Sequence, residues 1–202
     1  MRLYFIRHGE SEANLLNEIS NRGRKHGLTA KGEAQVRALA DELRADDVRA
    51  IFASPLLRAE QSAEILAGPL GLPFQTTPAL SEYDMGVLEG RSDQEAWRAY
   101  KTLLHDWVLR GDWDARVEGG ESFNDIRARF VPFVERLRAE YTEVGGAVLL
   151  VGHGGLYRCM LPLVLDGISF EFALEHTVGN ADYVLAQPSG TRLVGLRWGN
   201  AL

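Results

Sequence analysis

Two of the five histidines lie in the same local setting, which is typical of residues that project into a binding or catalytic site. His8 and His153 each come directly after a short apolar run, and each is followed by glycine. Because parallel strands end at a common edge of a sheet, we expect both imidazoles at one site. Either histidine alone fits an ordinary polar residue at a strand end about equally well. The shared setting favours a site.

Two arginines indicate that the ligand of this site is an anion. Arg7 precedes His8, and Arg58 falls in the first turn of a helix that we expect to be capped by Ser54, with Pro55 at its first position. Guanidinium groups and the free amides at a helix start both bind phosphate oxygens. Arg58 by itself would also fit a solvated helix residue. Together these residues predict a site that handles a phosphoryl group.

A general acid for such chemistry is expected among three carboxyl groups. Glu82, Asp84 and Glu89 lie in the segment 80–90, which has no helical or strand periodicity and is typical of a functional loop. A buried carboxyl group near phosphate has a raised pKa, which suits a proton donor. The spacing of the three residues leaves the choice among them open.

The remaining polar residues give weaker signals. The sequence has no HExxH motif, no paired cysteines and no clustered histidines and carboxylates, so we expect no metal and no cofactor. His26, His105 and His176 have no supporting context. Residues 22–26 are locally basic and could receive a second anionic group of the substrate through Arg22, or form a solvated loop.

Strands and helices alternate along the chain, and this order predicts the fold. The apolar pattern predicts strands over residues 3–6, 48–53 and 147–151, and a terminal hairpin over 182–187 and 191–198. It predicts helices over residues 30–44 with Thr29 as the N-cap, 56–67 ended by Gly68 and Pro69, 93–108, 122–141 with a bend at Pro132, and 156–165. These elements predict an α/β three-layer sandwich in which helices flank a mostly parallel central sheet.

Composition limits the class of protein. A chain of 202 residues with 46% hydrophobic residues predicts one domain, residues 1–202. A net charge of -6 argues against a nucleic acid or an anionic membrane as partner. The single cysteine, Cys159, lies in an apolar setting, and no membrane span or signal peptide is visible, so a cytoplasmic protein is expected. The oligomeric state stays open, with a homodimer among the alternatives.

Six segments, in order over about four fifths of the chain, resemble the phosphoglycerate mutase-like branch of the histidine phosphatase superfamily. One such motif would be weak, whereas six in register are highly specific. The matching segments are Arg7-His8-Gly9-Glu10-Ser11 with Asn14, Leu28-Thr29-Ala30-Lys31-Gly32, Ser54-Pro55-Leu56-Leu57-Arg58-Ala59, Leu80-Ser81-Glu82 with Gly86 and Glu89-Gly90, Gly119-Gly120-Glu121-Ser122, and Val151-Gly152-His153-Gly154-Gly155.

The resemblance implies a role for each matching residue. His8 would be the nucleophile that carries a phosphohistidine, and Glu82 would be the acid that protonates the leaving oxygen. The implied phosphate pocket consists of Arg7, Arg58 and His153, and the implied substrate-contacting residues are Ser11, Asn14 and Gly154. The substrate would be a small phosphorylated metabolite.

Family members divide between phosphatases and mutases, and the sequence favours a phosphatase. Mutases of the family carry an Arg-His-Tyr-Gly-type sequence after the catalytic glutamate, whereas this chain has Tyr83-Asp84-Met85-Gly86. A phosphoglycerate would be held less firmly without those cations, so hydrolysis should prevail. A phosphoglycerate mutase remains the alternative, and a non-catalytic phospho-ligand binding protein is a weaker one.

Residues 91–120 are expected to form a lid over the pocket. Trp97, Trp107 and Trp113 would supply apolar walls to the substrate, or else would pack as ordinary core residues of amphipathic helices.

Overall fold

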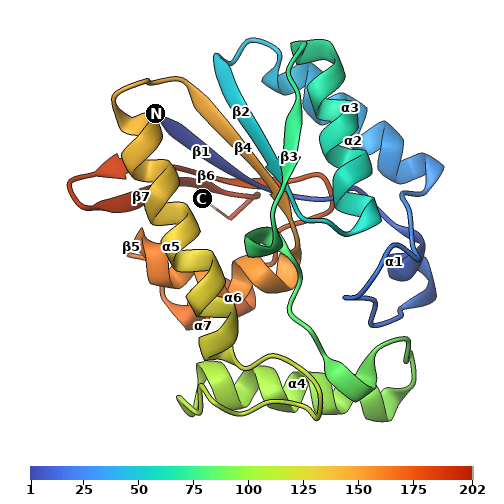
Figure 1. The fold of residues 1–202 in the computed structure, drawn as a ribbon. Coiled ribbons are helices and arrows are strands. Elements are labelled where there is room, and N and C mark those ends of the chain that lie inside the picture. Colours follow the sequence, from blue (N-terminus) through green and yellow to red (C-terminus); the bar gives the residue numbers. More distant parts are fainter. Residues whose placement is uncertain (202) are drawn as a thin grey trace.

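A central twisted sheet organises the computed structural model, which describes residues 1–201 (Figure 1). Within these residues the sheet has seven strands in the order β3-β2-β4-β1-β6-β7-β5. The strands β1 to β4 pair in parallel, whereas β6 runs antiparallel to both β1 and β7. The strands are β1 Arg2–Arg7, β2 Val48–Ala53, β3 Phe74–Thr76, β4 Ala147–Gly152, β5 Leu165–Asp166, β6 Tyr183–Ser189 and β7 Arg192–Trp198.

Helices cover both faces of the sheet, which confirms the predicted α/β sandwich. Helices α2 and α3 lie on one face, and α5, α6 and α7 lie on the other (Figure 1). Helix α4 lies apart from these layers, beyond the ends of the parallel strands. The helices are α1 Glu12–Leu16, α2 Ala30–Leu43, α3 Leu57–Leu70, α4 Gln94–Val108, α5 Phe123–Thr142, α6 Gly154–Val164 and α7 Phe170–Glu175, and short 3-10 turns occupy Pro78–Leu80 and Gly86–Leu88.

Buried hydrophobic residues form two cores, one on each face of the sheet, and the alternation of side chains along β1 contributes to both. Leu3 and Phe5 join the cluster that packs against α5 and α6, whereas Tyr4 and Ile6 join the cluster under α2 and α3. All six residues of β4 are buried, as expected for a central strand covered on both faces. Because both faces are packed, the ends of β1 and β4 are held firmly where His8 and His153 follow.

Three predicted helix boundaries are wrong. Helix α3 begins at Leu57 with Leu56 as the N-cap, and Ser54 instead accepts the Leu56 amide at 3.3 Å and contacts His153. The same helix continues through Pro69, because a proline in the last turn removes only one hydrogen bond before the helix ends at Gly71 with a φ of 64°. Helix α6 begins at Gly154 rather than Leu156.

The end of the chain also differs in detail from the prediction. The predicted hairpin forms from β6 and β7, and an additional short strand, β5, pairs with β7 on its outer side. Leu165, predicted as the end of a helix, is the first residue of β5. In residues 1–201, no helix combines the length and the apolar character needed to cross a membrane.

Candidate active site

His8 lies at the carboxyl end of β1, and its hydrogen bonds define its tautomer. Nδ1 lies 2.7 Å from the carbonyl oxygen of Gly9. Because a carbonyl only accepts, Nδ1 carries the proton and Nε2 keeps its lone pair. Burial, followed by the charges of Arg58 and Arg7, lowers the pKa of His8 well below its ordinary value. The imidazole is therefore neutral near pH 7, which is the nucleophilic form.

Two glycines allow the His8 loop to lie directly against helix α2. A Cβ atom on Gly9 would come within 2.5 Å of the carbonyl oxygen of Gly32, and one on Gly32 would overlap the Glu10 carbonyl oxygen. On the other side, the amide of Gly9 donates to Ser62 Oγ of α3 at 3.2 Å. The loop is thus fixed between two helices, which fixes the direction of the His8 ring.

Arg58 and His153 complete a buried polar cluster with His8. Arg58 Nε donates to His8 Nε2 at 3.1 Å, and Arg58 Nη2 lies 3.4 Å from His153 Nδ1. His153 Nε2 lies 2.7 Å from Ser54 Oγ, and it donates this bond because Nδ1 is the nitrogen that faces a donor. Burial, then Arg58, lowers the pKa of His153 well below its ordinary value. Burial lowers the pKa of Arg58 to about 10, which leaves it cationic at neutral pH.

Arg7 adds a second cation at the same strand end. Its Nη1 donates to the carbonyl oxygen of Val178 at 2.8 Å, which ties the side chain to the loop before β6. Its Nε is buried and has no hydrogen-bond partner among residues 1–201. Burial lowers the pKa of Arg7, and the Glu82 carboxylate partly offsets this. A buried guanidinium with a free N–H is suited to an anionic ligand.

Glu82 is held by two backbone amides. Oε1 accepts from the amide of Tyr83 at 3.2 Å, and Oε2 accepts from the amide of Gly155 at 2.9 Å. A Cβ atom on Gly155 would come within 2.7 Å of Oε2, so only glycine leaves room for this carboxyl group. Burial raises the pKa of Glu82 against the opposing effect of Arg58. A raised pKa keeps a fraction of the group protonated, as a proton donor requires.

The two other carboxyl groups of this segment have different partners. Asp84 forms an ion pair with Arg22 at 2.8 Å. Glu89 accepts the backbone amides of Asn21 and Arg22 at 2.9 and 3.1 Å. Neither carboxyl group lines the cavity that contains His8, whereas Glu82 does. Of the three carboxyl groups, Glu82 is therefore the one placed to reach a ligand in that cavity.

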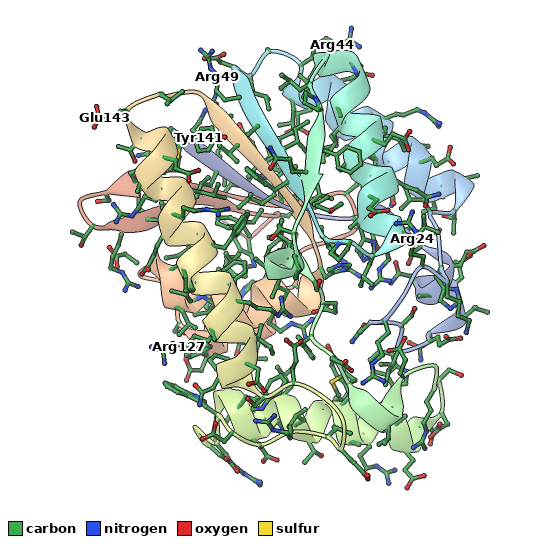
Figure 2. All side chains as sticks on the ribbon, in the orientation of Figure 1. Arg24, Arg44, Arg49, Arg127, Tyr141 and Glu143 are labelled. Carbon is green, nitrogen blue, oxygen red and sulfur yellow. The ribbon has the colours of Figure 1, made fainter. Side chains whose placement is uncertain are left out.

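A cavity of about 280 Å³ joins these groups between the strand ends and helix α4. Side chains extend from both sides into the space between the sheet and α4 (Figure 2). The sequence-predicted residues that line the cavity are Arg7, His8, Asn14, Arg58, Glu82 and Gly154. His153 does not line the cavity, because its ring is fully buried behind Arg58.

Two predicted substrate-contacting residues also lie outside the cavity lining. Ser11 is fully buried and donates to Asn14 Oδ1 through its amide at 3.0 Å and its hydroxyl at 3.1 Å, so it positions Asn14. Arg22 is exposed, and besides Asp84 it donates to the carbonyl oxygen of Gly119 at 2.8 Å. Arg22 therefore links its own loop to the segments that contain Asp84 and Gly119.

The rest of the basic segment 22–26 is likewise paired within the chain. Arg24, labelled in Figure 2, forms an ion pair with Glu60 of α3. Lys25 pairs with Glu18 at 2.7 Å, and buried His26 lies 3.0 Å from the same carboxylate. Arg24, Lys25 and His26 do not line the cavity around His8. A second anion of the substrate would need other cations.

Helix α4 supplies the wall of the cavity opposite the strand ends. Trp97, Tyr100 and Leu104 line the cavity at the helical spacing of one face. Of the other two tryptophans that were predicted as possible pocket walls, Trp107 is fully buried in the core and Trp113 stacks on Phe123. Trp97 alone of the three lines the cavity.

Sequence reasoning missed several residues of this site. Arg158 lines the cavity because it lies one turn after Gly154 on α6, and the spacing of four residues was the available signal. Lys101 lines it from α4. Asn180, which lies shortly before β6, donates to the carbonyl oxygen of His8 and to Asn14 Oδ1, both at 3.2 Å. No local sequence pattern marks this residue. Within residues 1–201, no group of three or more histidine, cysteine, aspartate and glutamate side chains has the geometry to hold a metal ion.

One cavity therefore brings together a buried neutral histidine, two arginines and a glutamate with a raised pKa. The family model of the histidine phosphatase superfamily, branch 1, matches residues 3–201. The chain belongs to that superfamily.

The proteins that this chain resembles include a phosphoglycerate mutase and several phosphatases. The chain is 35% identical over 175 residues to a 2,3-bisphosphoglycerate-dependent phosphoglycerate mutase of Methylobacterium sp. (strain 4-46), covering 84% of this chain and 82% of the relative. Among solved structures, a mycobacterial glucosyl-3-phosphoglycerate phosphatase has a TM-score of 0.81 and 26% identity, with 98% of each chain covered. The α-ribazole phosphatase of Shigella flexneri has a TM-score of 0.77 and 26% identity, covering 100% of this chain and 96% of that one.

Proposed function

We propose that this protein is a phosphomonoesterase that hydrolyses a small phosphorylated metabolite through a phosphohistidine on His8. The observation that carries the proposal is the unprotonated Nε2 of neutral His8, which accepts a hydrogen bond from Arg58 in a cavity that also contains Glu82. A phosphate monoester bound there would place its oxygens on the guanidinium groups of Arg7 and Arg58. Its phosphorus would then lie in front of the nucleophilic nitrogen.

Two steps complete the reaction. In the first, His8 Nε2 forms a bond to phosphorus, the bond to the ester oxygen breaks, and Glu82 gives its proton to that oxygen, which leaves as an alcohol. In the second, the Glu82 carboxylate takes a proton from water, the hydroxide oxygen bonds to phosphorus, and the bond to His8 breaks. Phosphate leaves, and Glu82 is protonated again. Arg7 and Arg58 stabilise the charge on the transferring oxygens in both steps.

The surroundings of Glu82 support water as the acceptor. Residues 83–86, directly after Glu82, present no cation to a substrate carboxylate, since Asp84 is their only charged residue and pairs with Arg22. This segment therefore would not hold the alcohol formed in the first step, which favours its departure before it could be phosphorylated at a second hydroxyl. The phosphatases among the structural relatives agree with this choice, whereas the Methylobacterium relative is named as a mutase.

The first experiment asks whether His8 is the nucleophile. Turnover of 4-nitrophenyl phosphate is measured for the wild type, His8→Ala and His105→Ala. His105 is an exposed histidine of α4 that does not line the cavity, so it is a matched control. We expect turnover to be lost in His8→Ala and unchanged in the control. A wild type that turns over no phosphomonoester would support the non-catalytic alternative, and an active His8→Ala would exclude the proposed nucleophile.

The second experiment separates hydrolysis from intramolecular transfer. The protein is incubated with 3-phosphoglycerate and a bisphosphoglycerate primer, and inorganic phosphate and 2-phosphoglycerate are both quantified. The proposal predicts that released phosphate exceeds the isomer. Dominant formation of 2-phosphoglycerate would identify a mutase instead. The same phosphate assay over phosphorylated sugars, nucleotides and cobalamin-pathway intermediates would narrow the substrate.

A further inference from the structure

Two further cations line the cavity from α4 and α6. Arg158 lies on α6 and Lys101 lies on α4. Neither forms an ion pair within 4.0 Å with a carboxylate among residues 1–201, whereas Arg22, Arg24 and Lys25 on the adjacent loop all do. The Nε of Arg158 is buried and has no hydrogen-bond partner in the same residues.

The acidic groups of the cavity have other partners. Glu18 accepts from Lys25 at 2.7 Å and lies 3.0 Å from His26. The oxygens of Glu82 accept the two backbone amides already described, and burial favours its uncharged form. The positive charge of Arg158 helps to lower the pKa of Arg7, and it also acts on Glu82, less strongly than Arg58 does. Two like charges around one cavity, with a buried N–H left free, are stabilised by an anion that the chain does not supply.

One phosphoryl group cannot engage all four cations in the proposed reaction. Its position is fixed by attack from His8, so it lies against Arg7 and Arg58 at the ends of β1 and β2. Lys101 lies on the helix that forms the opposite wall. The part of the substrate beyond the ester oxygen therefore extends toward Lys101 and Arg158.

We propose that Arg158 and Lys101 form a second anion subsite, which selects phosphomonoesters that carry a carboxylate or a second phosphate beyond the ester bond. The proposal rests on the proposed function, because the reacting phosphoryl group defines which end of the substrate faces these cations. Arg158 is partly buried and supplies most of the discrimination, and exposed Lys101 supplies less. The subsite concerns which substrate is held, whatever molecule finally accepts the phosphoryl group.

The test compares three substrates that share a three-carbon frame. Glycerol 3-phosphate has a neutral arm, 3-phosphoglycerate has a carboxylate, and glycerol 1,3-bisphosphate has a second phosphate. Because glycerol 1,3-bisphosphate has two equivalent ester groups, its rate is halved before the comparison. The ratio of kcat/KM for each anionic substrate to that for glycerol 3-phosphate is measured in the wild type, Arg158→Gln and Lys101→Gln. Arg98→Gln is the control, since Arg98 is an exposed cation of α4 outside the His8 cavity.

The subsite predicts a wild-type ratio of about tenfold or more, as expected for a charge-assisted hydrogen bond in a partly buried site. Arg158→Gln should remove most of this preference, and Lys101→Gln should reduce it by roughly two- to fivefold, the range for an exposed ion pair. Turnover of glycerol 3-phosphate should fall less than turnover of the two anionic substrates in either variant, because a neutral arm makes no ion pair with these cations. The larger of the two anionic ratios identifies carboxylate or phosphate as the better ligand.

Other results would overturn the subsite. A wild type without preference, or an Arg158→Gln variant that loses activity equally on all three substrates, would place Arg158 on the reacting phosphoryl group. If Arg158→Gln does not fold, Arg158→Lys keeps the charge and should keep part of the preference.

Equilibrium binding separates this proposal from the proposed function. Calorimetry with His8→Ala, which cannot form a phosphohistidine, measures the affinities for the same three compounds without turnover. Tighter binding of the anionic compounds supports the subsite even if the enzyme proves to hydrolyse none of them. Equal affinities contradict it.

Discussion

Gly155 controls the position of the proposed general acid, and replacing it with alanine is a sharp test of that role. The added Cβ would lie 2.7 Å from Glu82 Oε2 and 2.8 Å from Oε1. An ordinary contact begins at 3.4 Å, so the carboxyl group must move by at least about 0.7 Å, which also weakens the 2.9 Å bond from the Gly155 amide. Displacements of about 1 Å at a reacting group can cost about 100-fold in rate.

We therefore expect Gly155→Ala to lower kcat/KM for alkyl phosphates by roughly 10- to 100-fold. An aryl phosphate such as 4-nitrophenyl phosphate needs little help from an acid to lose its leaving group, so its first step should slow much less. Because the second step still needs Glu82 as the base, rapid mixing should show a burst of nitrophenolate, followed by slow turnover.

Gly68→Ala is the matched control for Gly155→Ala. Gly68 also lies inside a helix, and nothing lies within 4 Å of its added Cβ. This variant should keep wild-type kinetics and gain up to about 1 kcal/mol of stability from helix propensity. If Gly155→Ala keeps alkyl phosphatase activity within about twofold of the wild type while it remains folded, the placement of Glu82 by the two amides is not what catalysis requires.

Three further predictions follow from the polar groups and the cysteine. The phosphorylation step, measured as kcat/KM, should persist well below pH 6.5 because the pKa of His8 is lowered. Its rate should fall as the pH rises through the raised pKa of Glu82, which then loses the proton that it donates. Glu82→Gln should remove this fall at high pH, and a fall that survives in this variant would contradict the role of Glu82 as the acid. Ser54→Ala leaves the buried Nε2–H of His153 without its acceptor and should lower the free energy of unfolding, measured by urea titration, by about 1–3 kcal/mol. An unchanged midpoint of the titration would argue against that hydrogen bond. Burial raises the pKa of the Cys159 thiol to about 12, so a disulfide reagent at pH 8 should label it only in denatured protein, and rapid labelling of folded protein would refute its burial.

The main elements of the site could be predicted because they depend on local patterns. Continuous apolar runs before His8 and His153 specify β1 and β4, and two parallel neighbours in a sheet necessarily end at the same edge. The position of Arg58 follows from its place early in the helix after β2. The fold class could be predicted for the same reason, since strands alternating with helices have few arrangements.

Other features could not be predicted because they depend on contacts between distant segments. Ser54 has the sequence context of an N-cap, yet it bonds to His153, 99 residues further along the chain. The basic residues of segment 22–26 have the composition of an anion site, but carboxylates from other segments neutralise them. Asn180 is marked by no local pattern, yet it donates to the carbonyl oxygen of His8 and to Asn14 Oδ1.

The central claim is the covalent intermediate on His8, and trapping it is the most direct test. Glu82→Gln is mixed with 4-nitrophenyl phosphate, quenched in alkali and digested, and the phosphorylated peptide is sequenced by mass spectrometry. We predict one acid-labile, alkali-stable phosphoryl group per protein molecule, located on His8 and absent from the double variant with His8→Ala. A phosphoryl group on another residue, or nitrophenolate release without any phosphoenzyme, would contradict the account.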